Sequence, residues 1–451
     1  MNSMRVMRAG PGPARTFLKA GGVAAALVLA AAPLPASAAA TAAPKVAEVA
    51  SDGIQDFYRA RNGRPLWLAP QAGNAAQMML GLLNSASVDG LDPNRYQVRK
   101  IAGALQSARR GNARDISRAD AMLSQAFVAY ARDLRQAPNL GIIYVDRELV
   151  PAPPSARFLL ETAAAAPSLE VFVDSMGWMN PLYAQLRRNV TGGRFANADE
   201  RALLTVNLER VRALPATRER YVVVNTAAQR LYMYENGQVV DSMRVVVGKP
   251  KYPTPMMNAF IRAAALNPYW NVPADLAAER IAPNVVKQGV GYLKSMGYEV
   301  LSDWTENATL VDPATIDWEA VADGRVDVRI RQLPGPQNAL GKMKFVFPNA
   351  QGIFLHDTPE RQLLSEASRL YSGGCIRLED AARLARWMFG RDLKKSGEAP
   401  EQLVPIPTLV PLYVTYLTAV PSGPTIARFD DVYGQDAARL ATLGGGPFAS
   451  R

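Results

Sequence analysis

The chain contains one cysteine and one histidine, Cys375 and His356, and they lie 19 positions apart. His356 ends an apolar stretch, whereas Cys375 follows two glycines. A free thiol has a pKa of about 8.5 and needs help to ionise at neutral pH. An imidazole within hydrogen-bond reach can take its proton and activate it as a nucleophile. We therefore predict that Cys375 is the nucleophile of a cysteine enzyme and His356 its general base and acid.

The sequence around Cys375 suggests how a reacting carbonyl would be held. Glycine at 373 and 374 leaves the approach to the sulfur free of side chains and permits a tight turn. We predict that the backbone N–H groups of Gly374 and Cys375 form an oxyanion hole, a feature whose loss costs about 3 kcal/mol per donor. A helix expected to start near Leu378 or Glu379 would lower the thiol pKa if its N-terminus faced the sulfur.

Two elements would have to bring the two side chains together. We expect a strand over 352–356, then a helix that begins at Thr358-Pro359 and returns the chain towards Cys375. Threonine is a good N-cap and proline suits the first helical position. Since Asp357 would point to the other side of the strand from His356, we expect a backbone carbonyl to orient the imidazole.

A structural interpretation competes with the catalytic one. A lone cysteine is most often a small buried apolar residue, and a lone histidine is often only a satisfied polar residue. The position of both on one strand–turn unit favours catalysis. One Cys also excludes a disulfide within the chain and a cysteine-based zinc site, and one His excludes a two-histidine site. We predict neither a metal nor another cofactor.

The N-terminus predicts export. Residues 1–38 combine a basic start, an apolar stretch over 21–34 and a small-x-small cleavage signal that ends at Ala38. Removal of its four basic residues lowers the formal charge from +11 to +7 (11 − 4). We therefore expect a periplasmic protein, soluble in the envelope without a transmembrane segment, whose partner is an anionic envelope polymer and not nucleic acid.

The rest of the chain divides by its patterning into an α+β protein. We predict a spacer over 39–50, a helical domain over 51–195, a β-rich domain over 218–420 with an insertion at about 274–330, and a flexible C-terminal tail over 421–451. Asn236-Gly237, between two alternating apolar runs, predicts a two-residue hairpin turn.

The order of residues resembles a known family. His356, then fifteen residues, then Ser372-Gly373-Gly374-Cys375-Ile376-Arg377 is similar to the signature of L,D-transpeptidases, which have a YkuD-type catalytic domain. Gly373 stands where a second histidine is usual, and a small residue there resembles the large YcbB-like subgroup. Upstream, Pro65-Leu66-Trp67 and 89–93 look like that subgroup's N-terminal scaffold domain, and 267–273 resembles a segment of its catalytic domain.

The resemblance implies a function in peptidoglycan. The Cys375 thiolate would attack the L,D bond of a stem tetrapeptide, release D-alanine, and pass the acyl group to an amine of a neighbouring stem as a 3→3 cross-link. The insertion would cap the cleft. Two alternatives stay open: an L,D-carboxypeptidase with water as the acceptor, and a non-catalytic wall-binding protein.

The resemblance and side-chain chemistry also suggest substrate contacts. Arg377 is a candidate for a substrate carboxylate, with a structural ion pair as its alternative. Trp270 would line the cleft or, as we favour, fill the core. The predicted substrate-binding residues are Arg377, Ser372, Gly373 and Tyr371.

Overall fold

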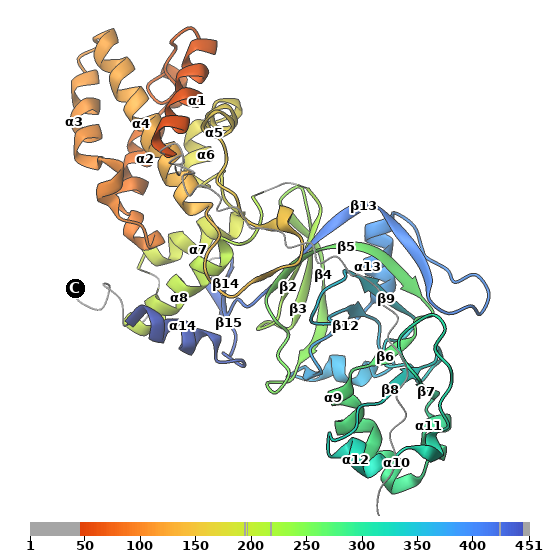
Figure 1. Cartoon of the computed structure of the whole chain (residues 1–451). Coiled ribbons are helices and arrows are strands. Elements are labelled where there is room, and N and C mark those ends of the chain that lie inside the picture. The colour runs from red at the N-terminus through yellow and green to blue at the C-terminus, as the bar shows by residue number, and fades with distance from the viewer. Residues whose placement is uncertain (1–45, 194, 196, 217–218, 424, 445–451) are drawn as a thin grey trace, which may run out of the picture. The chain divides into compact units, whose positions relative to one another are not determined.

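The computed structural model describes residues 46–444 except 194, 196, 217–218 and 424. The predicted leader (1–38), most of the spacer and the last seven residues of the chain lie outside this part. Helices make up the first half of the described chain and strands dominate the second (Figure 1). The predicted α+β class is confirmed. No helix in the described ranges is both long and apolar enough to cross a bilayer.

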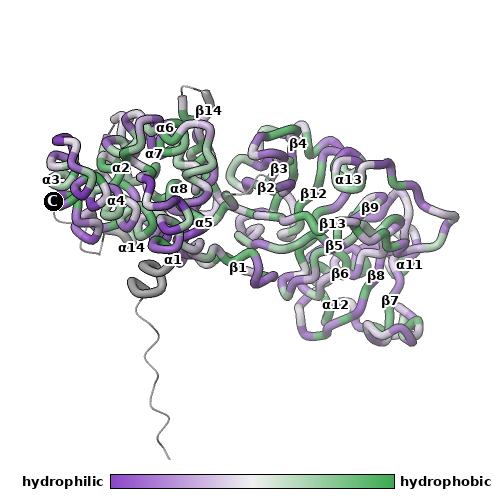
Figure 2. The backbone as a smooth tube through the Cα atoms, turned by 90° about the horizontal axis from the view of Figure 1, so that it is seen from above, coloured by the Kyte–Doolittle hydropathy of each residue, from purple (hydrophilic) through white to green (hydrophobic). Residues whose placement is uncertain are grey.

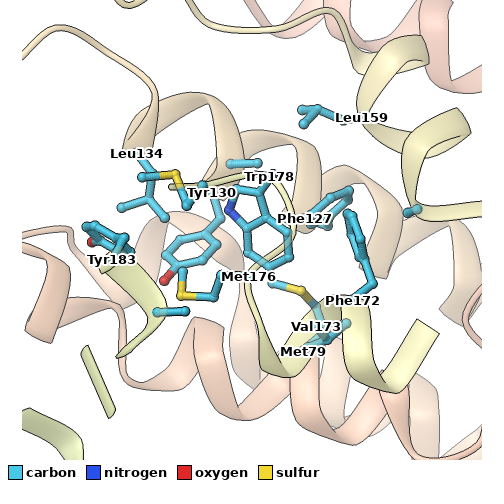
Figure 3. Packing of buried hydrophobic residues seen from close by; sticks show 14 of the residues in the cluster. Met79, Phe127, Tyr130, Leu134, Leu159, Phe172, Val173, Met176, Trp178 and Tyr183 are labelled. Carbon is cyan, nitrogen blue, oxygen red and sulfur yellow. The ribbon is translucent and has the colours of Figure 1, made fainter. Parts of the chain in front are cut away.

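Helices fill the region up to Val211 and surround an aromatic core. Trp178 packs against Phe127 and Phe172, at ring-centroid distances of 5.0 and 5.4 Å (Figure 3). Side-chain caps set several helix starts, as at Asn180, whose Oδ1 accepts from the Leu182 amide. The helices are α1 (Val46–Ala60), α2 (Ala75–Asn84), α3 (Val98–Ala108), α4 (Ala113–Leu134), α5 (Ala156–Ala165), α6 (Leu169–Asp174), α7 (Pro181–Thr191) and α8 (Ala198–Val211).

Eight strands close into a barrel in the order β5-β13-β2-β3-β4-β12-β10-β9, because β9 also pairs with β5. The β2–β3–β4 meander contains the predicted hairpin, and both Asn236 (φ 53°) and Gly237 (φ 76°) adopt positive φ. The barrel strands are β2 (Tyr221–Asn225), β3 (Arg230–Glu235), β4 (Gln238–Gly248), β5 (Met257–Leu266), β9 (Met343–Val346), β10 (Leu355–His356), β12 (Ile376–Leu378) and β13 (Gln402–Thr415).

Alternate side chains along these strands point into the barrel and form its core. Val222, Val224, Leu355 and Ile376 belong to one buried apolar cluster, and helix α13 (Ala381–Phe389) contributes further side chains to it. Hydrophobic stretches of the backbone follow β5, β12 and β13 (Figure 2). Two short strands pair with the barrel from outside, β1 (Ile143–Tyr144) with β5 and β11 (Leu370–Ser372) with β4.

A small subdomain is inserted between β5 and β9. Its three-stranded sheet has the order β6-β8-β7, and it has its own apolar cluster, which includes Ile281, Trp318 and Ile330. We call it the cap (residues 270–332). Its elements are β6 (Trp270–Val272), α9 (Ala274–Leu276), the π-helical turn η5 (Ala277–Ile281), α10 (Ala282–Gln288), α11 (Gly291–Ser295), β7 (Tyr298–Leu301), α12 (Trp318–Ala322) and β8 (Arg329–Gln332).

The described part of the C-terminal segment, up to residue 444, is folded, whereas the sequence predicts a flexible tail over 421–451. It forms the hairpin of β14 (Ala419–Ser422) and β15 (Thr425–Arg428), followed by α14 (Gln435–Gly444). Asp436 is buried and forms an ion pair with Arg210 of α8. This segment is therefore packed against the helical region.

Candidate active site

Two neighbouring strands place the histidine and the cysteine on the same side of the sheet. β10 runs parallel to β12, with His356 opposite Arg377 and Leu355 opposite Ile376. Because side chains alternate along a strand, Cys375 and Arg377 share one face, which is also the face of His356. Leu355 and Ile376 point the other way, into the barrel core. One face of β10 and β12 therefore packs in the barrel core, and the opposite face carries the side chains that could do chemistry.

That face opens into a cavity of about 640 Å³ between the barrel and the cap. Its lining includes Cys375, His356 and Arg377, together with Ser372 and Gly373. The structure thus brings five of the predicted site residues to one cavity. Tyr371, also predicted to bind substrate, is 41% exposed and lies outside this lining. Trp270, for which we favoured the core, is half-buried and lines the cavity from the cap.

The buried imidazole is oriented by a backbone carbonyl. Nδ1 of His356 lies 2.5 Å from the Asp357 carbonyl oxygen. Since a carbonyl only accepts hydrogen bonds, Nδ1 carries the proton and Nε2 has a free lone pair. Burial, and then the positive charge of Arg377, lower the pKa of His356 to about 3. The ring is therefore a neutral base at neutral pH. The Asp357 carboxylate turns away to the Lys342 amide, 2.9 Å away, and to Arg361.

The thiol is half-buried and protonated at rest. Its Sγ lies 3.6 Å from the carbonyl oxygen of Gly352. Burial raises the pKa of Cys375, although Phe354 backbone hydrogen bonding and the charge of Arg377 act in the opposite direction. The expected helix N-terminus does not follow the cysteine directly. Strand β12 comes first, and α13 begins only at Ala381 with Asp380 as its cap.

The segment between the two residues also differs from the prediction. In place of a helix from Pro359, the chain forms only the short 3₁₀ turn η7 (Arg361–Ser365) and then strand β11. The Val247 amide donates to the Arg369 carbonyl, and the Arg369 amide donates to the Gln229 side chain. Pairing with β4 therefore holds this segment as strand β11, and the chain does not form a helix beyond η7. Within this segment Leu364 is buried, but Ala367 is exposed.

The turn before Cys375 is fixed by hydrogen bonds that involve the predicted oxyanion hole. The Gly374 amide donates to Ser372 Oγ (3.1 Å), and that hydroxyl donates to the Cys375 carbonyl (2.6 Å). The Gly374 amide is thus already used inside the turn, which contradicts its predicted role. The Cys375 amide stays a candidate donor. Ser372, predicted to bind substrate, is 2% exposed and braces the turn.

Two residues that sequence reasoning missed support this turn from outside. Thr254 Oγ1 donates to the Gly374 carbonyl (2.7 Å) and accepts from the Gly248 amide (2.9 Å). Tyr433, from the C-terminal segment, donates from its hydroxyl to the Gly248 carbonyl (2.6 Å). No local signal marks Tyr433, because its partner lies 185 positions away.

Arg377 is largely committed within the protein. It is 7% exposed and forms an ion pair with Glu360, and both residues line the cavity. Arg377 therefore forms the structural ion pair that the sequence left as the alternative to binding a substrate carboxylate. Its charge still acts on the site, since it lowers the pKa values of both His356 and Cys375.

Comparisons with known proteins point to one family. Residues 219–395 match the L,D-transpeptidase catalytic domain (YkuD), and residues 52–189 match a domain described as a scaffold domain. A candidate L,D-transpeptidase from Haemophilus influenzae strain Rd is 27% identical over 399 residues, which are 84% of this chain and 77% of that protein.

Two solved structures share little sequence with the chain. An L,D-transpeptidase from Mycobacterium smegmatis is 17% identical, with 44% of this chain and 58% of that one covered at a TM-score of 0.21. The Ldtfm–avibactam carbamoyl enzyme is 13% identical, with 49% and 63% covered at a TM-score of 0.21. The chain thus spans less than two thirds of the length of either solved protein.

Proposed function

The chain belongs to the L,D-transpeptidase family, with a scaffold domain before its catalytic domain, and on this premise we propose that it is a cysteine enzyme that cross-links peptidoglycan. The observation that carries the proposal is the shared face of β10 and β12. There the sole thiol and the sole imidazole of the chain open into one cavity. Export to the periplasm, which the N-terminal sequence predicts, is part of the proposal.

The reaction needs only these two side chains and backbone amides. As Cys375 Sγ attacks the carbonyl carbon of the L,D bond, Nε2 of His356 takes the thiol proton. The C–N bond breaks, His356 returns that proton to the departing D-alanine amine, and a thioester remains. An amine of a neighbouring stem then attacks the thioester and gives up a proton through His356 to the sulfur. The products are a 3→3 cross-link and the free thiol.

A carbapenem tests the nucleophile directly, because the resemblance to L,D-transpeptidases implies that such compounds acylate Cys375. We expect meropenem to add one mass equivalent to the intact protein in mass spectrometry. Cys375→Ala should abolish the adduct and leave the circular dichroism spectrum unchanged. An adduct that persists in Cys375→Ala would assign the chemistry to another residue and overturn the proposal.

Muropeptides distinguish this function from hydrolysis. The half-buried thiol lies in a cavity that water can enter, so an L,D-carboxypeptidase is the second candidate. Incubation with tetrapeptide muropeptides should give cross-linked dimers if transfer is the function. Tripeptide monomers alone would identify a hydrolase. Binding to sacculi without any turnover would leave only a wall-binding protein.

A further inference from the structure

The cations that line the cavity differ in whether a carboxylate neutralises them. Lys344 Nζ lies 2.7 Å from Glu401, and Arg377 is paired with Glu360. Arg280 lines the same cavity from the cap, but within the described residues no carboxylate lies within ion-pair distance of it. Its guanidinium donates a long hydrogen bond, 3.5 Å, to the Tyr371 carbonyl. Among the described residues that line the cavity, Arg280 is therefore the arginine or lysine without a carboxylate partner.

Arg280 is held beside the reactive turn by its own helix. It lies in η5, and π-helical turns of this kind occur often at functional sites. One residue earlier, Glu279 accepts from Lys249 (2.5 Å), Lys251 (3.0 Å) and Tyr252 (2.7 Å) of the barrel. On the other side, Leu276 packs so closely on the turn that a Cβ at position 373 would lie 3.0 Å from its Cδ1.

The chemistry of this position favours a carboxylate ligand. A guanidinium binds carboxylates through two parallel hydrogen bonds, which gives strength and orientation. In the proposed reaction, the donor tetrapeptide carries a free carboxylate on the D-alanine that leaves. Only the D-alanine residue itself separates this carboxylate from the scissile bond. Arg377, the other arginine of the cavity, already has a carboxylate partner in Glu360.

We propose that Arg280 binds the terminal carboxylate of the donor stem peptide and thereby selects donors whose leaving residue is a free acid. The inference rests on the proposed function, since it assumes a stem peptide in this cavity. It assigns to the cap a role in substrate choice in addition to covering the site.

Binding measurements can test this without turnover. The protein with Cys375→Ala is titrated by calorimetry with a stem tetrapeptide that ends in D-alanine and with the same peptide that ends in D-alaninamide. We expect the amide to bind about 10- to 100-fold more weakly, as for loss of a charge-assisted hydrogen bond. Addition of Arg280→Gln should make the two peptides bind alike, whereas Arg280→Lys should keep part of the preference.

Arg325→Gln is the matched control, because Arg325 is a cap arginine paired with Asp323 on an exposed surface. It should keep the full preference for the acid. A preference that survives Arg280→Gln, or equal binding of both peptides to the parent, would overturn the inference. Loss of the proposed function would appear separately, as a Cys375 protein that forms no carbapenem adduct and no dimers while the acid preference persists.

Discussion

At the residue scale, burial determines the resting state of the reactive pair. It lowers the pKa of His356 to about 3 and raises the pKa of Cys375. Both effects disfavour the charged form, as expected for groups removed from water. The structure therefore favours a neutral thiol and a neutral imidazole over a preformed ion pair. Proton transfer then accompanies the attack on the substrate.

This resting state predicts a flat pH profile. His356 stays neutral as the pH falls to about 3, and Cys375 stays protonated as the pH rises towards its raised pKa. We expect kcat/KM for dimer formation to change by less than about threefold between pH 5 and 8, since kcat/KM reports the pKa values of the free enzyme. An acidic limb centred near pH 6.5 would contradict this and indicate an imidazole exposed to water.

The two glycines before Cys375 should respond differently to alanine. Gly374 has φ +113°, a region that L-residues rarely adopt, and its added Cβ would lie 3.1 Å from Ile353. Gly374→Ala should therefore cost about 1–3 kcal/mol and slow acylation strongly. At Gly373, the Cβ would meet only the flexible end of Leu276, so Gly373→Ala should cost less than about 1 kcal/mol.

Urea unfolding and the rate of carbapenem adduct formation measure both effects. Gly373→Ala serves as the control for Gly374→Ala, because both add one methyl group to the same turn. Equal losses in the two variants would show that the turn is sensitive to bulk and not to backbone conformation.

At the element scale, sequence patterns predict the parts of the site that depend on local chemistry. The hairpin at Asn236-Gly237 was predictable because two positions with positive φ demand those residues. His356 and Cys375 were recognisable because each occurs once in the chain. The backbone carbonyl that orients His356 followed from strand alternation.

Elements fixed by distant partners were not predictable. The segment after Pro359 has the sequence of a helix start, but its later residues pair with β4 and form strand β11. The composition of the final segment predicts a loose tail, yet Asp436 of this segment is bound by Arg210, 226 positions away. The predicted role of Gly374 in an oxyanion hole met a local obstacle instead, because Ser372, two residues earlier, accepts from its amide. Tertiary contacts decide the first two cases, and no local propensity reports them.

The contact between the cap and the barrel predicts a change in local dynamics. Glu279 accepts hydrogen bonds from Lys249, Lys251 and Tyr252, and these contacts lower its pKa to about 2. The contacts are therefore fully present above pH 4.5 and are lost only as the pH falls through about 2. We expect Glu279→Gln to make amide hydrogen exchange in 274–288 roughly 3- to 10-fold faster at pH 7.

Glu319→Gln is the control, because Glu319 is an exposed cap carboxylate on α12. It should leave exchange in 274–288 unchanged. Unchanged exchange in Glu279→Gln would show that apolar packing, such as that of Leu276, holds the cap alone.

At the scale of the whole molecule, one apolar core joins the helical region to the barrel. Trp178 and Leu214 from the first part share a cluster with Tyr221 and Tyr413 on β2 and β13. The C-terminal segment adds polar connections to both parts. Tyr433 donates to Gly248 at the end of β4, next to the Thr254 contact that holds Gly374. The scaffold region and the reactive turn are therefore connected through the last residues of the described chain.

The buried ion pair between Arg210 and Asp436 should make a large contribution to this connection. Arg210 is 2% exposed and Asp436 4%, so Asp436→Asn would leave a buried guanidinium without its countercharge. We expect a loss of about 3–5 kcal/mol in the free energy of unfolding by urea. The double change Arg210→Met with Asp436→Leu should recover most of this loss, because a matched apolar pair avoids the cost of burying charge.

Asp392→Asn is the control for Asp436→Asn. It breaks an exposed pair with Arg386 and should cost less than about 1 kcal/mol. Equal effects of the two single changes would mean that the C-terminal helix unfolds without loss to the rest of the protein, and that the scaffold and barrel are held together by the apolar core alone.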